Sequence, residues 1–251
     1  MQDLFLIKMP LFCPKYKHWK RYGWRNAKEK ENLIKTLTDS SMGYCMYCYR
    51  RVVVIDKFFG QIEHAIEKSN SQLLTECIPN MGIACPACNQ SLKRIGEKNR
   101  KITEQNIKQF EENVSCRQGR KQCTVACKSL SQLAEEYCKS EYAHIILQPM
   151  GKRNIASKAE YLIQYNVLNN IFEPANDHNQ YEDYDLQFIE DHIDRFHLNE
   201  GVDNPNFFFQ FLKLVIDNQG TIPEYEYNDL PVKSTSTTHQ LWHEAPICGI
   251  L

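Results

Sequence analysis

Apolar side chains recur at helical spacing in three parts of the chain. Residues 26–38 form one such segment, with apolar positions at Leu33, Ile34 and Leu37. Asn89 to Arg100 has the composition of a helix start that continues into a basic face. Apolar positions between residues 155 and 217 indicate further helices. The pattern therefore predicts a chain with a large helical content.

A β-branched run suggests a hairpin between the first two of these segments. Residues 50–56 read Arg-Arg-Val-Val-Val-Ile-Asp, and the segment 61–64 follows after Phe-Phe-Gly. We expect these two runs to be the paired strands of one hairpin, with His64 late on the second strand. Pro79 and Gly82 then interrupt the chain around Asn80.

Length and composition favour a globular protein of 251 residues with 42% hydrophobic residues. We expect no membrane association, because no apolar run reaches the roughly 18 residues that a membrane span needs. Asp3 and Lys8 flank the short run Leu4–Ile7, so a secretory signal is not expected. The chain has 11 cysteines, of which two pairs have zinc-knuckle spacing. A reducing compartment, and hence a cytoplasmic location, is the expectation.

The net charge of -1 conceals an uneven distribution. Residues 1–130 contain 23 Lys and Arg against 12 Asp and Glu, whereas residues 131–251 contain 7 against 19. A basic half suits a polyanionic partner such as DNA, because lysine and arginine contacts to phosphates supply most non-specific affinity. The acidic half is expected to present a surface that is solvated or docks a protein partner.

Residues 1–40 form a basic, aromatic N-terminal arm. Eleven positions from Lys15 to Arg25 hold most of its aromatic and basic residues. Such interleaving suits a surface that follows a nucleic-acid backbone through stacking and cation–π contacts. The alternative is an amphipathic connector whose tryptophans belong to the core.

Two Cys-x-x-Cys pairs make the strongest signal for a bound metal. Cys45, Cys48, Cys85 and Cys88 supply four thiolates, which is a complete tetrahedral ligand set for a structural zinc ion. Between the pairs lie Glu63 and His64, which a structural zinc site does not require. Four other cysteines, Cys116, Cys123, Cys127 and Cys138, have spacings of 7, 4 and 11 and contain no such knuckle, so we expect no second zinc site.

Residues 43–93 resemble the HNH nuclease family, which has the ββα-metal fold, and in particular members with a four-cysteine zinc site. The resemblance rests on Cys-Met-Tyr-Cys, Ile-Glu-His, Asn80 and Cys-Pro-Ala-Cys-Asn, with Lys93 following. The steps of sixteen residues from His64 to Asn80 and nine from Asn80 to Asn89 agree with the family. Glu63 stands where the family usually has aspartate, Asn89 where many members have histidine, and Lys93 one residue later than usual.

The resemblance implies a DNA endonuclease with one catalytic ion. His64 would be the general base, since a neutral imidazole with a pKa near operating pH can take the proton of the attacking water. Glu63 and Asn89 would be oxygen ligands of one Mg²⁺ or Mn²⁺. Asn80 resembles the family's middle asparagine, which braces the loop and orients the base.

These observations predict an α+β protein in four parts. Residues 1–40 are the arm, 41–100 the zinc-bound HNH nuclease module, 101–232 a mostly helical region that is acidic from about 131, and 233–251 a tail. The alternative function is a non-catalytic zinc-ribbon module that binds nucleic acid or a protein. Nucleases of this size and layout are also similar to effector subunits of bacterial anti-phage defence systems. An ATPase or another subunit of such a system would then dock on the acidic half.

Overall fold

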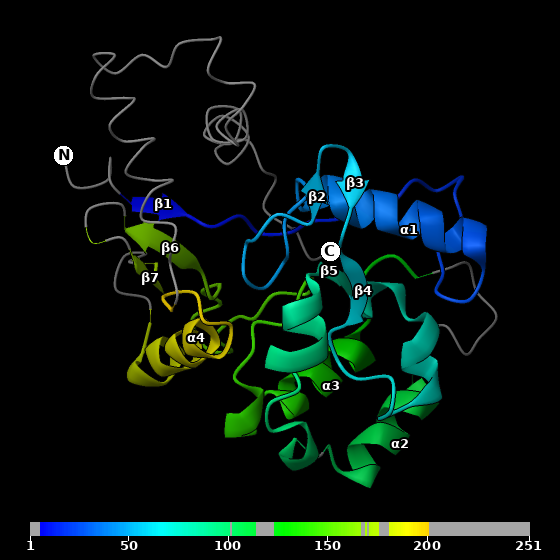
Figure 1. Ribbon diagram of the computed structural model, residues 1–251. Coiled ribbons are helices and arrows are strands. Elements are labelled where there is room, and N and C mark those ends of the chain that lie inside the picture. Colours follow the sequence, from blue (N-terminus) through cyan, green and yellow to red (C-terminus); the bar gives the residue numbers. More distant parts are fainter. Residues whose placement is uncertain are drawn as a thin grey trace.

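The chain is an α+β protein, as predicted, with small antiparallel sheets and separate helices (Figure 1). The structure is a computed structural model. It describes residues 6–100, 102–113, 123–166, 169, 171–175 and 181–200. The predicted tail at 233–251 and the segment 201–232 lie outside these described residues.

Helix α1 (Ala27–Ser40) confirms the prediction of a helix at 26–38. Asn26 caps it, because its side-chain oxygen accepts hydrogen bonds from the backbone N–H groups of Lys28 and Glu29 at 3.0 and 3.1 Å. Leu33 and Leu37 are fully buried, and the helix contacts strand β5 (Met81–Ala84). The apolar face of α1 thus covers the sheet that carries His64.

The predicted strand pairing is wrong. Strand β2 (Val53–Val54) pairs with β3 (Lys57–Phe58), and β4 (Gln61–His64) pairs with β5. The cause is a tight turn at Ile55 and Asp56, where φ is +48° and +58°. This turn folds the β-branched run back onto the next two residues. Strand β4 is left to pair with a segment that lies beyond a sixteen-residue loop.

A helical turn follows β5 but is shorter than predicted. Residues Cys88–Leu92 form a π-helical turn, η4, and a 3₁₀ turn, η5, covers Glu97–Asn99. Gly96 lies between them at φ +71°, a left-handed conformation that ends a helix and suits glycine. The predicted continuous helix from Asn89 to Arg100 is therefore wrong. The order that results is strand β4, strand β5 and a helical turn.

A third sheet, with three strands, joins the start of the described chain to its later part. Its order is β1 (Leu6–Lys8), β6 (Ile163–Asn166) and β7 (Ile171–Pro174), all antiparallel. The prediction of helices from 155 to 217 is thus wrong at β6 and β7, and it holds for α4 (Asp183–Arg195), which packs on β7. Four-residue strands are too short to show a clear period, and β6 has one partner, β1, that lies over 150 residues away in sequence.

Helices α2 (Glu104–Asn113) and α3 (Lys128–Tyr137) pack against each other beneath the β4–β5 pair (Figure 1). Short 3₁₀ helices occupy Gln72–Glu76 (η2), Ile78–Asn80 (η3) and Glu141–Ala143 (η7). The first two lie in the loop between β4 and β5.

Helix α4 docks on the loop that holds the first cysteine pair. Tyr47 is fully buried there, and its ring stacks on that of Phe196 with centroids 4.8 Å apart. His192 on α4 accepts a hydrogen bond at Nδ1 from the backbone N–H of Ile146 at 3.0 Å. Helix α4, which belongs to the acidic second half, is therefore packed against the cysteine-bearing part of the molecule.

The aromatic residues of the N-terminal arm divide between core and surface. Phe12 and Tyr22 are buried, whereas 68% of Trp19 is exposed. Trp24 is half-buried at the edge of the His64 site. The alternative that the arm's tryptophans belong to the core is thus wrong for Trp19, and a nucleic-acid surface on the arm stays a prediction.

Candidate functional site

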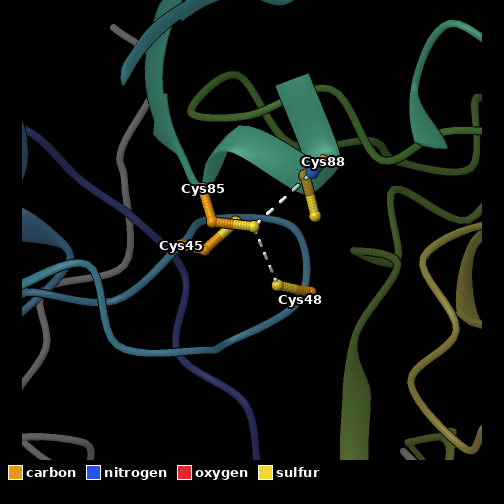
Figure 2. Close-up of side chains that lie close together, drawn as sticks. All are labelled: Cys45, Cys48, Cys85 and Cys88. Carbon is orange, nitrogen blue, oxygen red and sulfur yellow. Dashed lines mark hydrogen bonds between the residues drawn. The ribbon is translucent and has the colours of Figure 1, made fainter. Parts of the chain in front are cut away.

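Four thiols converge between the first cysteine loop and the end of β5. Cys45 and Cys48 lie in the loop between α1 and β2, Cys85 follows β5 directly, and Cys88 opens η4 (Figure 2). Their sulfur atoms all lie within 4.8 Å of one another. A backbone hydrogen bond of 2.9 Å from Met46 to Ile83 holds the loop against β5.

The cluster has the dimensions of a zinc site. A tetrahedron with Zn–S bonds of about 2.3 Å places its sulfur atoms roughly 3.8 Å apart. The sulfur atoms of Cys48 and Cys85 are 3.7 Å apart. Cys85 also accepts a hydrogen bond from the backbone N–H of Cys88 at 3.5 Å, which stabilises a thiolate. The predicted four-cysteine cluster is confirmed, and it can hold one zinc ion.

The chemistry of the four thiols also favours a bound cation. Hydrogen bonds with Cys45 and Cys85 raise the pKa of Cys48, and hydrogen bonds with the other three cysteines raise the pKa of Cys88. All four groups can be thiolates together only when a cation balances their charge. Within the described residues, these four form the single cluster of three or more His, Cys, Asp or Glu ligands. Cys123, Cys127 and Cys138 join no such cluster, and Cys116 lies outside the described residues.

His64 is the last residue of β4, and its ring is held from two sides. Its Nε2 lies 3.2 Å from the carbonyl oxygen of Thr75. Because a carbonyl can only accept, Nε2 carries the hydrogen and Nδ1 keeps a lone pair. The ring of Trp24 meets the imidazole edge to face, with centroids 5.1 Å apart. Strand, loop and arm thus fix both the position and the tautomer of His64.

The surroundings of His64 favour the neutral imidazole. Burial lowers the pKa of His64, and the positive charges of Lys68 and Lys93 add to that effect. The hydrogen bond to Thr75 opposes the shift but does not reverse it. The residue is 9% exposed. A neutral histidine with a free Nδ1 can accept a proton at neutral pH.

Asn80 is fully buried and joins the two ends of the β4–β5 loop. Its side-chain oxygen accepts a hydrogen bond from the backbone N–H of Ile66 at 2.8 Å, and its amide nitrogen donates to the Ile66 carbonyl at 2.9 Å. The Asn80 carbonyl also accepts from the Ala65 N–H at 2.8 Å. These three bonds hold the chain immediately after His64.

Glu63 lies in a buried ion pair. One carboxylate oxygen accepts a hydrogen bond from the Tyr47 hydroxyl at 2.7 Å, and the other pairs with the Lys93 ammonium group. Lys93 also donates to the carbonyl of His64 at 2.6 Å. Burial raises the pKa of Glu63, and Lys93 and Tyr47 partly oppose the rise. Lys93 therefore ties the helical turn to the end of β4.

The ion pair continues into a network that the sequence did not predict. Glu67 lies 3.7 Å from Lys93 and accepts hydrogen bonds from Arg100 at 2.8 Å and Tyr137 at 2.7 Å. Burial alone would raise the pKa of Glu67, but Lys93 and Arg100 outweigh it and lower the pKa. Of the residues around Glu67, only Lys93 belonged to a pattern that the sequence showed. Glu67, Arg100 and Tyr137 are far apart in the chain and show no motif.

Asn89 lies beside β4, where its amide nitrogen donates to the side-chain oxygen of Gln61 at 2.8 Å. Both residues line a groove of about 290 Å³ that also includes Trp24 and Lys30. No hydrogen bond joins Asn89 to Glu63 in the described residues. Each of the two predicted ligands of a catalytic ion is bonded to protein partners, so these side chains do not form a ready-made cation site.

Comparisons of the chain with protein families, with curated proteins and with solved structures find no match. The described residues contain no helix of sufficient length and apolarity to cross a membrane. The function must therefore be argued from the site itself.

Proposed function

We propose that this protein is a nuclease of the HNH type that hydrolyses phosphodiester bonds in DNA, with His64 as the general base. The observation that carries the proposal is the bond between His64 Nε2 and the Thr75 carbonyl. It leaves Nδ1 able to accept a proton, and burial keeps the ring neutral at neutral pH.

The surrounding residues support the same role. The order of β4, β5 and helical turn, stapled by four cysteines, agrees with the ββα arrangement that the resemblance implies. Asn80 and Lys93 act as positioning residues, because they bond to the backbone at Ile66 and His64. We propose that Glu63 positions β4 through its pair with Lys93.

The chemical step needs one proton acceptor. His64 Nδ1 takes a proton from water, the water oxygen bonds to phosphorus, and the P–O3′ bond breaks. The departing 3′ oxygen takes a proton from solvent. In nucleases a divalent ion stabilises the charge that builds on the phosphate. Asn89 and Glu63 are the oxygen donors predicted for such an ion, but both are engaged elsewhere, and no step is assigned to it.

Cleavage by the zinc-loaded chain tests the proposal, with plasmid and oligonucleotide DNA in Mg²⁺, in Mn²⁺ and in chelator. His64→Gln is the informative variant, because an amide nitrogen can still donate to Thr75 but cannot act as a base. We expect its rate to fall roughly 10²- to 10⁴-fold. His197→Gln, which removes a partly exposed imidazole that follows α4, is the matched control and should cleave normally.

Two outcomes would replace the proposal. Normal cleavage by His64→Gln would remove His64 from the chemistry. Zinc-dependent binding without any cleavage by the wild type would favour the non-catalytic zinc-ribbon module. A protein partner on the acidic half, such as an ATPase of a defence system, remains a prediction from size and layout.

A further inference from the structure

A groove lies beside the His64 site and has the lining of a site for a planar ligand. Its volume is about 290 Å³. Its apolar walls come from Trp24 before α1, Ile34 on α1, Phe58 on β3 and Ile62 on β4. Its polar groups are Lys30, Gln61 and Asn89. Apolar walls with a few placed polar groups are typical of small-ligand pockets. We call this the Trp24 groove.

Two lysines converge on Trp24 without a carboxylate partner. The ammonium group of Lys30 lies 4.2 Å from the centroid of the Trp24 ring, and that of Lys68 lies 5.0 Å from it. Neither forms an ion pair with a carboxylate in the described part of the chain. Two cations gathered at one ring, neither of them in an ion pair within the described residues, favour an anionic ligand such as a phosphate.

The backbone at Trp24 is held in place by Glu76. The carboxylate of Glu76 accepts hydrogen bonds from the backbone N–H groups of Trp24 at 2.8 Å and Arg25 at 3.0 Å. Gly23 permits this approach, because a Cβ there would lie 3.1 Å from Glu76 and 2.7 Å from a Glu29 carboxylate oxygen. Glu76 follows Thr75, which orients His64. One loop therefore positions both the proposed base and the wall of the groove.

The side-chain amides of Gln61 and Asn89 supply hydrogen-bonding groups in the groove. The bond from Asn89 to Gln61 uses one amide nitrogen and one amide oxygen. Whichever way the two amides are turned, one N–H₂ group and one carbonyl oxygen remain for a ligand. A nucleobase presents donors and acceptors of this kind along its edge, as in the pairing of Asn or Gln with adenine.

We propose that the Trp24 groove binds one unpaired nucleotide of a DNA strand. The base lies against the apolar walls and the Gln61–Asn89 amides, and Lys30 and Lys68 hold its phosphate. A base inside a groove cannot be stacked in a duplex, so the strand must be single-stranded or locally opened. The inference rests on the proposed function in naming DNA as the ligand. The ring contact between Trp24 and His64 places this nucleotide next to the scissile bond.

Binding by full-length, zinc-loaded His64→Gln protein tests the inference without cleavage. Fluorescence anisotropy is measured with a labelled twelve-residue oligothymidylate, the same sequence as a duplex, and a twelve-residue oligomer of abasic units. We expect the single strand to bind more tightly than the duplex. Adding Trp24→Ala should weaken binding of the single strand roughly 5- to 100-fold, the range for one stacked base. It should barely change binding of the abasic oligomer.

Loss of Lys30 and Lys68 should affect oligonucleotide binding differently from loss of Trp24. Lys30→Ala with Lys68→Ala should weaken both single-stranded ligands and lower the slope of log affinity against log salt by about 0.7, as for one lost phosphate contact. Lys35→Ala removes one lysine charge from an exposed site on α1, and its effect should be far less than half that of the lysine pair. Trp24→Phe retains a ring and should keep most of the affinity.

Several results would overturn the inference. The inference fails if Trp24→Ala weakens binding of the thymidylate and abasic oligomers equally, or if Lys35→Ala weakens binding as much as the lysine pair does. It also fails if the duplex binds as tightly as the single strand. Circular dichroism and zinc content exclude misfolding, and Trp24→Phe gives a second reading if Trp24→Ala does not fold. If the wild type cleaves no DNA but Trp24→Ala still loses the thymidylate, the groove stands and the nuclease proposal fails.

Discussion

Removing Lys93 should show how much the buried ion pair contributes to the stability of the folded protein. Lys93 is 3% exposed, and its ammonium group bonds to Glu63 and to the carbonyl of His64. Lys93→Met removes both bonds at similar volume. Loss of one partner from a buried pair costs about 3–5 kcal/mol, because the other charge is left buried. A domain of this kind is stable by roughly 5–15 kcal/mol, so the loss is a large fraction of the total.

The stability lost in Lys93→Met should depend on pH, and the pKa of Glu63 determines in which direction. Burial raises the pKa of Glu63, and Lys93 is the main group that opposes the rise. In Lys93→Met the pKa of Glu63 in the folded state therefore lies further above its value of about 4.3 in the unfolded state. A carboxyl of this kind opposes folding above its unfolded pKa, because the unfolded state releases the proton more readily. The deficit should be largest at pH 8 and shrink as the pH falls toward 5.

Urea denaturation of the zinc-loaded protein, followed by circular dichroism at pH 5.5 and pH 8, measures the effect. Glu63→Gln should cost less than Lys93→Met, because Lys93 keeps Glu67 at 3.7 Å. Glu63→Gln with Lys93→Met should recover part of the loss, since neither charge is then left alone. A cost below about 1 kcal/mol for Lys93→Met, equal at the two pH values, would refute a buried, energetically coupled pair.

Three further predictions follow from the site. Cys88→Ser should lose zinc and unfold the β4–β5 region, whereas Cys127→Ser, at the N-cap of α3, should keep about one zinc per chain by metal analysis. Burial lowers the pKa of His192 to about 3, so the folded state should lose up to about 5 kcal/mol as the pH falls from 6.5 toward 3. In His192→Gln, urea denaturation should show a smaller loss over that range; an unchanged slope would contradict the assignment. Lys68→Ala should raise the pKa of His64 and move the acid limb of cleavage to higher pH, and Lys35→Ala should leave the pH–rate profile where it is.

Local patterns were sufficient for the elements that depend on near neighbours. The apolar positions 33, 34 and 37 predicted α1, because a helical face is set within a few residues. The spacing of Cys45, Cys48, Cys85 and Cys88 predicted a converging cluster, because a metal with four thiolates requires it. The resemblance drew attention to His64 and Asn80 before any contact was known.

Contacts between distant segments could not be predicted in this way. Strand β4 pairs with Met81–Ala84 across a long loop, and β6 pairs with β1 from the other end of the chain. Such pairings are decided by which segments the whole fold brings together, and four-residue strands show no period that competes with a helical pattern. The tertiary structure also decided that Glu63 faces Lys93 and Tyr47.

The sequence by itself therefore determined the chemistry available to this protein: four thiolates for a zinc ion, an imidazole beside a carboxylate, and a basic first half. The tertiary structure decided how those groups are used. A backbone carbonyl at Thr75 selects the tautomer of His64, and Trp24 gathers two lysines at the edge of its groove. A carbonyl is present in every residue, so only the folded chain can show which one accepts the bond.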